Sequence, residues 1–218
     1  MACVIVLMGP QGAGKGTQGQ MLAKRLQAPI VATGDMLREV ARSDGQLGRQ
    51  VKLIQESGNL VSDEVLAEIV GERLSRNDCE NGCILDGFPR TLPQAKQLDG
   101  IAAGRNFQVF VINIEVPRDQ LRKRLTGRRT CPSCGTIYNV YFKPSKHDNI
   151  CDLDGQPLHT RADDNEQAIA RRLAAYDEMT QPVLEHYRKQ GKLRHIDGTA
   201  PPEEVYRGLE SVIAAFSA

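Results

Sequence analysis

A glycine-rich segment with one lysine is the stretch of this chain best suited to phosphate chemistry. It reads Gly-Pro-Gln-Gly-Ala-Gly-Lys-Gly-Thr from Gly9 to Thr17 and follows the apolar run Cys3–Met8. Glycines let backbone N–H groups approach phosphate oxygens, and a helix that begins here adds the positive end of its dipole. Lys15 supplies a mobile charge that can follow a phosphoryl group in transfer. The pattern predicts a phosphate-binding loop between a strand and a helix.

The loop departs from the general pattern at one position. The hydroxyl residue expected directly after the lysine is displaced, because Gly16 stands there and Thr17 follows. We therefore expect the usual direct hydroxyl ligand of Mg²⁺ to be absent or altered. The alternative, a glycine-rich turn without a ligand, is disfavoured by the strand and helix patterns on either side.

A carboxylate follows a second buried strand. The apolar run Cys83–Leu85 ends in Asp86, and a Gly-Phe-Pro-Arg turn continues to Arg90. Ligands of open parallel sheets bind beyond the carboxyl ends of the strands. We expect Asp86 to lie at the same edge as the glycine loop, where it can hold Mg²⁺. Its alternative role is to cap the turn that follows.

A protein catalyses phosphoryl transfer mainly by positioning the two substrates and by placing positive charge around the transferring group. A phosphate monoester is already an anion near neutral pH, so the acceptor needs no general base, and none is apparent beside the loop. Guanidinium groups suit bidentate phosphate contacts. The candidates for this charge are Lys15, Arg38, Arg90, Arg124, Arg128, Arg161 and Arg172.

Three cysteines and an aspartate have the spacing of a metal site. Cys131-x2-Cys134 is followed, after sixteen residues, by Cys151-x2-Asp154. Two such knuckles are typical of a zinc ribbon, and a carboxylate can serve as the fourth ligand. The alternative fourth ligands are His147 and His159, and the alternative for the whole segment is three free cysteines in an insert. Four protein ligands leave no open position, so we expect a structural Zn²⁺.

Composition excludes several classes of protein. The 218 residues carry a net charge of +1, which does not favour nucleic acid or an anionic membrane as a partner. No stretch reaches the roughly 18 apolar residues that span a bilayer, and the first apolar run lacks the basic start of a signal peptide. The six cysteines, unevenly placed, suit a reducing compartment. We expect a cytoplasmic protein.

Strand patterns alternate with helix patterns along the chain, which predicts an α/β fold with a doubly wound parallel sheet of five strands flanked by helices. The expected strands are Cys3–Met8, Pro29–Ala32, Cys83–Leu85, Phe107–Val116 and Lys192–Ile196. Helical patterns follow each strand, among them one that begins after Ser62 and a long one that begins near Asn165. These elements would place the glycine loop and Asp86 together.

A set of motifs in fixed order resembles the adenylate kinases, a family of nucleoside monophosphate kinases that interconvert MgATP plus AMP with two ADP. The motifs are the glycine loop, Thr33-Gly-Asp35, Leu85-Asp-Gly-Phe-Pro-Arg90, Gln94, Arg124-Leu-Thr-Gly-Arg128, Arg161-Ala-Asp-Asp164 and Arg171-Arg172-Leu173. The resemblance covers essentially the whole chain. The long insert is similar to the zinc-type lid of that family, whose lids carry four cysteines or three cysteines and an aspartate. This resemblance supports Asp154 as the fourth ligand.

The resemblance implies three parts and a direct transfer between nucleotides. A core would comprise residues 1–31, 62–126 and 165–218, a helical domain for the nucleoside monophosphate residues 32–61, and a lid residues 127–164. The lid and the small domain would close over both substrates and exclude water. The implied partners are ATP, AMP and ADP, and the implied state is a monomer that serves adenine nucleotide homeostasis.

The resemblance also implies site residues. Those for ATP are Gly12, Ala13, Gly14, Lys15, Gly16, Thr17, Arg124, Arg128, Ile137, Tyr138 and Ala200. Those for AMP are Thr33, Arg38, Asn59, Leu60, Val61, Gly87, Phe88, Pro89, Arg90, Gln94, Arg161 and Arg172. The catalytic set is Lys15, Arg90, Arg124, Arg128, Arg161, Arg172 and Asp86. Two positions depart from the family pattern: Ala32 stands where serine is common, and Ala200 where lysine is common.

Two other functions remain open at this point. One is a phosphate-loop switch or a nucleic-acid-binding module whose zinc ribbon binds a partner. The near-neutral net charge of the chain disfavours this function. The other keeps the chemistry but uses UMP or CMP as acceptor, or GTP as donor. The resemblance disfavours the pyrimidine acceptors, because those relatives usually have a short lid.

Overall fold

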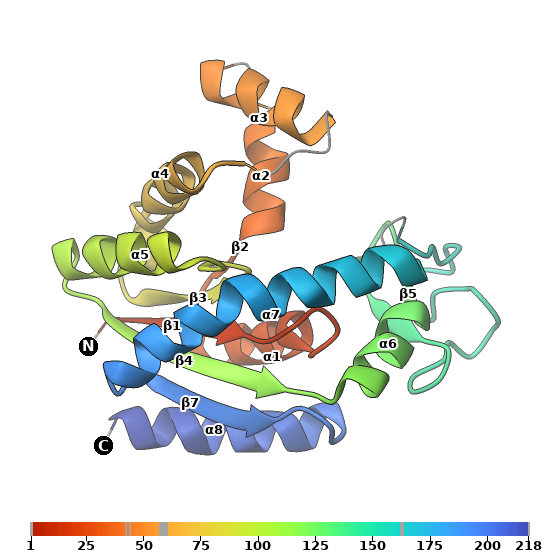
Figure 1. Ribbon diagram of the computed structural model, residues 1–218. Coiled ribbons are helices and arrows are strands. Elements are labelled where there is room, and N and C mark those ends of the chain that lie inside the picture. Colours follow the sequence, from red (N-terminus) through yellow and green to blue (C-terminus); the bar gives the residue numbers. More distant parts are fainter. Residues whose placement is uncertain (1, 42, 44, 57–60, 162–163, 218) are drawn as a thin grey trace.

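A five-stranded parallel sheet lies between two layers of helices in the computed structural model, which describes residues 2–41, 43, 45–56, 61–161 and 164–217 (Figure 1). The strand order is β2-β3-β1-β4-β7, and every pairing is parallel. The strands are β1 (Cys3–Met8), β2 (Ile30–Ala32), β3 (Gly82–Asp86), β4 (Gln108–Glu115) and β7 (Leu193–Asp197). The expected α/β fold is confirmed; β1 has the expected ends, and the other strands have ends shifted by one residue.

Alternate residues of the strands serve two separate cores. In β1, Val4 and Val6 belong to one buried cluster, and Ile5 and Leu7 belong to the other. The first cluster includes α4 (Asp63–Leu74), α5 (Leu92–Gly104) and the later part of α7 (Glu166–Lys189). The second includes α1 (Lys15–Leu26), α6 (Arg118–Thr126), the first turns of α7, and α8 (Pro202–Ser217). Both sheet faces are covered, which is why the central strand β1 reads as a continuous apolar run.

Two smaller parts project from this core (Figure 1). One contains α2 (Thr33–Ala41) and α3 (Gln46–Glu56), which pack on each other. The other contains the antiparallel pair β5 (Arg128–Thr130) and β6 (Ile137–Asn139). A buried cluster of its own, made of Cys131, Tyr138, Cys151 and Leu158, lies in this second part. Its core is small, so the apolar side chains alone supply little stability. A short helix, η1 (Asn77–Cys79), precedes β3.

Polar side chains mark where the long helices begin. Ser62 accepts a hydrogen bond from the Val65 N–H at the start of α4, and Asn165 accepts one of 2.9 Å from the Ala168 N–H at the start of α7. Such caps satisfy backbone donors that have no partner within the helix. Asn165 therefore fixes the point at which the chain returns from β5 and β6 to the core.

Strand register brings the chemically important residues to one edge. Leu7 of β1 pairs with Asp86 of β3, and Asp86 pairs on its other side with Ala32 of β2. The glycine loop after β1, Asp86 and Thr33 therefore emerge together. Among the described residues, no helix is long and apolar enough to cross a membrane.

We expect Gly82→Ala to lower the free energy of unfolding by about 2 to 4 kcal/mol. Gly82 begins β3 with φ 104°, and a Cβ there would lie 1.9 Å from the Cys3 carbonyl oxygen. Gly100→Ala is the matched control, because a Cβ in that exposed turn of α5 would meet no atom within 4 Å. It should stabilise the protein by about 0.5 to 1 kcal/mol. Chemical denaturation checks both variants, and equal midpoints would contradict the expectation.

Candidate active site

The glycine loop turns sharply at the end of β1. Gly9 has φ 139°, and a Cβ at that position would lie 2.6 Å from the carbonyl oxygen of Ile114 in β4. Gly14 is the residue directly before α1, and Lys15 is the first residue of that helix. The first turn of α1 contains no acidic side chain. Its backbone N–H groups and the helix dipole thus favour a bound anion, as the sequence predicted.

Lys15 rests against the loop itself. Its Nζ donates to the carbonyl oxygens of Gly9 and Pro10, at 2.7 and 3.1 Å. Burial lowers the pKa of Lys15 to about 8; Asp86 opposes this shift, whereas the charges of nearby arginines add to it. Those arginines are Arg90, Arg128 and Arg172. Four of the basic residues predicted for the site therefore share one electrostatic neighbourhood at the glycine loop.

Asp86 lies beside the first turn of α1. A Cβ on Gly16 would be 3.8 Å from Asp86 Oδ2, and the Asp86 main-chain oxygen accepts a hydrogen bond of 3.2 Å from the Thr33 hydroxyl. The carboxylate therefore stands next to the place where phosphates would bind. Oxygen donors of this kind are the ligands that Mg²⁺ prefers, so the donor chemistry fits the ion that the sequence predicts here.

Arg90 is held by the turn that carries it. Its Nε donates to the Gly87 carbonyl oxygen at 2.8 Å, and its backbone N–H donates to Gln94 Oε1 at 2.7 Å. Gln94 is buried and donates to Asp63 Oδ1 at 2.6 Å. Gly87 lies close to Thr33, because a Cβ on Gly87 would be 2.4 Å from the Thr33 hydroxyl oxygen. The residues predicted for the monophosphate are thus neighbours on this side of the loop.

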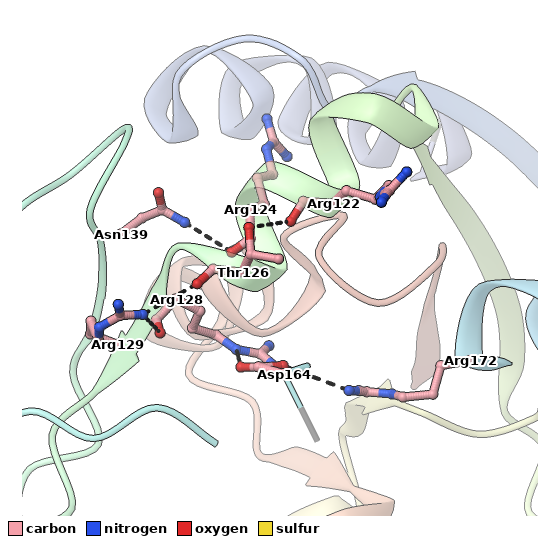
Figure 2. Close-up of polar contacts among 8 residues, drawn as sticks. All are labelled: Arg122, Arg124, Thr126, Arg128, Arg129, Asn139, Asp164 and Arg172. Atoms are coloured by element: carbon pink, nitrogen blue, oxygen red, sulfur yellow. Dashed lines mark hydrogen bonds and ion pairs between the residues drawn. The ribbon is translucent and has the colours of Figure 1, made fainter. Parts of the chain in front are cut away.

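One buried carboxylate joins two of the predicted arginines (Figure 2). Arg128 of β5 donates to Asp164 through Nε at 2.8 Å and through a terminal nitrogen at 2.5 Å. Arg172 of α7 lies 3.7 Å from the same carboxylate, whose side chain has no exposed surface. Asp164 thereby links the segment that contains β5 to the helix that follows it. A buried carboxylate needs such partners, because burial without them is costly.

Arg124 takes a different position. Its guanidinium donates to the Gly198 carbonyl oxygen at 2.7 Å and lies 3.5 Å from the carbonyl oxygens of Gly12 and Ala13. In Figure 2 it points away from the Arg128–Asp164 pair. Arg124 therefore connects the glycine loop to the loop after β7, next to the half-buried Ala200.

For the other predicted site residues the structure gives only the burial of the side chain, or they lie outside the described residues. Asn59 and Leu60 fall outside the described residues, as does the side chain of Arg38 on α2. Val61 packs at the edge of the first core, Phe88 and Pro89 are buried, and Arg161 is exposed. Thr17 is half-buried in α1.

The two residues expected beside the ATP base have different surroundings. Tyr138 is 4% exposed, and its hydroxyl oxygen accepts a hydrogen bond of 2.8 Å from the Asp152 N–H. Ile137 is 37% exposed. The Tyr138 side chain is thus engaged within its own segment, whereas the Ile137 side chain is open to solvent.

The predicted metal ligands converge. The ligand atoms of Cys131, Cys134, Cys151 and Asp154 all lie within 4.8 Å of one another. Cys131 Sγ is 3.2 Å from Asp154 Oδ2, and the Sγ atoms of Cys134 and Cys151 are 3.6 Å apart. Thiolates and a carboxylate in one cluster form a donor set that suits a divalent metal ion.

The two knuckles have equivalent backbone hydrogen bonds. In the first, the Gly135 N–H donates to the Cys131 carbonyl oxygen at 3.1 Å; in the second, the Gly155 N–H donates to the Cys151 carbonyl oxygen at 3.0 Å. Asp154 therefore occupies in the second knuckle the place that Cys134 occupies in the first. His147 and His159 are not members of the metal-ligand group found among the described residues.

Two residues of the site were missed or underrated by sequence reasoning. In the sequence, Asp63 is only part of the helix start Ser62-Asp63-Glu64, but in the structure it accepts hydrogen bonds from both Gln94 and the Thr91 hydroxyl, the latter at 2.7 Å. For Asp163 and Asp164 the sequence leaves three roles open: orienting arginines of the insert, ligating water, or capping the helix that begins near Asn165. No spacing signal identifies either role, because their partners are distant in the sequence.

Comparison with known proteins identifies the family. The family model described as adenylate kinase matches residues 7–192. The chain is 43% identical over 210 residues to an adenylate kinase of Archaeoglobus fulgidus, covering 96% of this chain and 97% of that protein. It is 45% identical over 213 residues to an adenylate kinase of a Geobacillus species, covering 97% and 99%. With the glycine loop, Asp86 and the arginines assembled at one sheet edge, these matches show that the chain belongs to the adenylate kinase family.

Proposed function

We propose that this protein transfers the terminal phosphoryl group of MgATP to AMP, reversibly and directly, giving two ADP. The observation that carries the proposal is the group formed by Lys15, Arg90, Arg128 and Arg172 at the glycine loop of a member of the adenylate kinase family. Such a group supplies the positive charge that stabilises a phosphoryl group in transfer between the phosphates of two nucleotides. The reaction serves adenine nucleotide homeostasis.

Donor and acceptor occupy opposite sides of Asp86. The ATP phosphates bind residues 12–17, and the base lies against Ile137, the main chain of Tyr138, and Ala200. AMP binds Thr33, Arg38, residues 59–61 and 87–90, and Gln94. The closeness of Gly87 to Thr33, and the bond from Arg90 to Gln94, support the acceptor side. The contact of Arg124 with the loop after β7 supports the donor side.

The chain's own groups then act by position and charge. Lys15 leaves the carbonyl oxygens of Gly9 and Pro10 for the phosphates, while Arg90, Arg128, Arg161 and Arg172 surround the transferring group and Arg124 holds the loop. Asp86 would hold Mg²⁺ through water, and the ion, when bound, would supply charge neutralisation at the phosphate oxygens. No residue needs to remove a proton, because the attacking phosphate oxygen is already anionic.

Domain closure protects this chemistry from water. We assign residues 32–61 to a mobile AMP domain, 127–164 to a lid, and 1–31, 62–126 and 165–218 to the core. The separate small cluster around Tyr138 supports the lid boundaries. Because Asp164 bonds to Arg128, lid movement and the placement of a site arginine are linked. Closure with both substrates bound makes AMP, and not water, the acceptor.

The lid metal is a structural Zn²⁺ on Cys131, Cys134, Cys151 and Asp154. The equivalent hydrogen bonds of the two knuckles support Asp154 as the fourth ligand. The ion supplies the cross-link that a core of four side chains does not provide.

The acceptor and the arginines are tested together. We expect ADP formation from MgATP with AMP, and much less transfer to GMP, CMP or UMP. Arg172→Ala should lower kcat/KM by about 100-fold or more, because a charged group at the transferring phosphate is lost. Arg171→Ala changes the exposed neighbour on the same helix and should leave kcat/KM within about twofold. Preference for another monophosphate would overturn the acceptor, and no transfer at all would overturn the reaction.

The metal site is tested by zinc content and thermal unfolding. We expect one Zn²⁺ per chain, and a lower melting temperature after its verified removal, because the lid loses its cross-link. Asp154→Ala should weaken zinc binding by more than about 100-fold. Removal of a residue that only hydrogen-bonds to a metal ligand already lowers metal affinity about tenfold to 100-fold, and Asp154 is proposed as a ligand itself. Asp154→Cys should retain the ion, as should His147→Ala and His159→Ala. An unchanged melting curve without zinc would contradict a structural role.

The lowered pKa of Lys15 predicts a pH effect on ATP binding. Bound phosphates favour the charged ammonium and raise its pKa above the value of about 8 in the free protein. At a pH between the Lys15 pKa of the free protein and that of the complex, the protein takes up a proton when it binds MgATP. The affinity for MgATP therefore falls as the pH rises above about 8. Calorimetric titration in buffers of different ionisation enthalpy measures this uptake. Lys15→Arg, which stays charged, should remove it; uptake that persists in that variant would assign it to another group.

A further inference from the structure

Asn139 connects the segment that contains β5 and β6 to the end of α6. It is the last residue of β6, and its partner across the strand pair is Arg128 of β5. Its Nδ2 atom donates a hydrogen bond of 2.9 Å to the main-chain oxygen of Arg124, in the last turn of α6 (Figure 2). The last four carbonyl groups of a helix have no partner within it, so this bond satisfies an acceptor that the helix leaves open.

The oxygen of the same amide organises the turn after β6. Asn139 Oδ1 accepts hydrogen bonds from the backbone N–H groups of Tyr141 and Phe142, at 2.9 and 3.3 Å. An amide turned the other way would point its own N–H hydrogens at these two donors. The turn therefore fixes which atom of the side chain faces α6, and Nδ2 is the atom that meets the Arg124 carbonyl oxygen.

Gly127 lets the two segments approach this closely. It follows α6 directly, and its carbonyl oxygen accepts a hydrogen bond of 2.9 Å from the Val140 N–H. A Cβ on Gly127 would lie 2.5 Å from Tyr141 Cδ2 and 2.8 Å from Asn139 Oδ1. The turn after β6 thus packs directly on the main chain at the end of α6, where any residue larger than glycine would push the two apart.

The helix end that Asn139 holds carries a residue of the proposed donor site. The Arg124 guanidinium donates to the Gly198 carbonyl oxygen at 2.7 Å. It also lies 3.5 Å from the carbonyl oxygens of Gly12 and Ala13, in the glycine loop. Arg124 therefore receives the Asn139 bond on its main chain and reaches the glycine loop with its side chain. A displacement of that main chain would move the guanidinium with it.

We propose that Asn139 is a positioning residue for the phosphate donor: its bond to the Arg124 carbonyl oxygen fixes the helix end from which Arg124 reaches the glycine loop. This role rests on the proposed reaction, in which Arg124 belongs to the ATP side. It is indirect, because Asn139 acts through Arg124 and touches no reacting atom. Asn139 belongs to the proposed lid and Arg124 to the core, so the bond makes the order of the lid a condition for the placement of a donor residue outside it.

Two variants of Asn139 remove the bond but keep an acceptor for the turn. Asn139→Ser places a neutral hydroxyl near the Tyr141 and Phe142 N–H groups, but its shorter side chain does not reach Arg124. Asn139→Asp keeps the shape of the side chain, but its carboxylate has no proton to donate. We expect both variants to raise KM for ATP by about twofold to tenfold, the range for one neutral hydrogen bond, with KM for AMP unchanged.

Ser145→Ala is the matched control for loosening of the proposed lid. The Ser145 hydroxyl donates to the His147 carbonyl oxygen at 2.8 Å, and this bond stays within the lid segment. The control should leave KM for ATP within about twofold. An equal rise in the control, or an unchanged KM for ATP in both Asn139 variants, would overturn the proposal.

A double variant separates action through Arg124 from any other effect on the donor site. Arg124→Ala removes the guanidinium but leaves the carbonyl oxygen that Asn139 holds. In that background Asn139→Ser should raise KM for ATP little further, because the group that it positions is gone. Additive rises would contradict the positioning role. If the unmodified protein transfers no phosphate, the reaction is overturned instead, and the same set of variants, measured by calorimetric binding of MgATP, decides the role of Asn139.

Discussion

Mutual repulsion among positive charges is the constraint on which the rest of this structure depends. Arg90, Arg128 and Arg172 lie close enough to Lys15 for their charges to lower its pKa. The protein limits this repulsion with buried or nearby carboxylates, Asp164 and Asp86, and with backbone carbonyl oxygens that receive Lys15 and Arg124. A cluster of like charges still costs stability, and such clusters are common at functional sites, where a ligand of opposite charge relieves the repulsion.

The parallel sheet makes this arrangement geometrically possible. Every strand points its carboxyl end toward the same edge, so residues that are far apart in the sequence reach one place through register alone. Leu7, Asp86 and Ala32 lie side by side on three strands. Helices on both faces bury most of β1, β3 and β4, and this support allows the loops at the edge to be irregular.

The sequence was sufficient to predict the fold and which residues gather at the edge of the sheet. Strands such as Cys3–Met8 are apolar throughout because both faces are buried, and the glycine loop has a spacing that few other functions need. The knuckles were equally readable, since each is set by residues close in sequence. The roles of Asp63 and Asp164, and the hydrogen bond from Asn139 to Arg124, were not predictable. Each depends on the packing of helices against other segments, and ordinary residue types such as Asn or Asp give no local signal.

The equivalence of the two knuckles has a consequence for how this protein can change over evolutionary time. Cys134 and Asp154 occupy matching positions in a segment with its own small cluster, and neither contacts the glycine loop in the described structure. If these positions bind a metal ion as proposed, exchange between sulfur and oxygen there would alter how firmly the segment is cross-linked, and it would reach Arg128 only through β5. Selection for a warmer or colder habitat could then act on one codon, with no substitution among the residues proposed to bind phosphate.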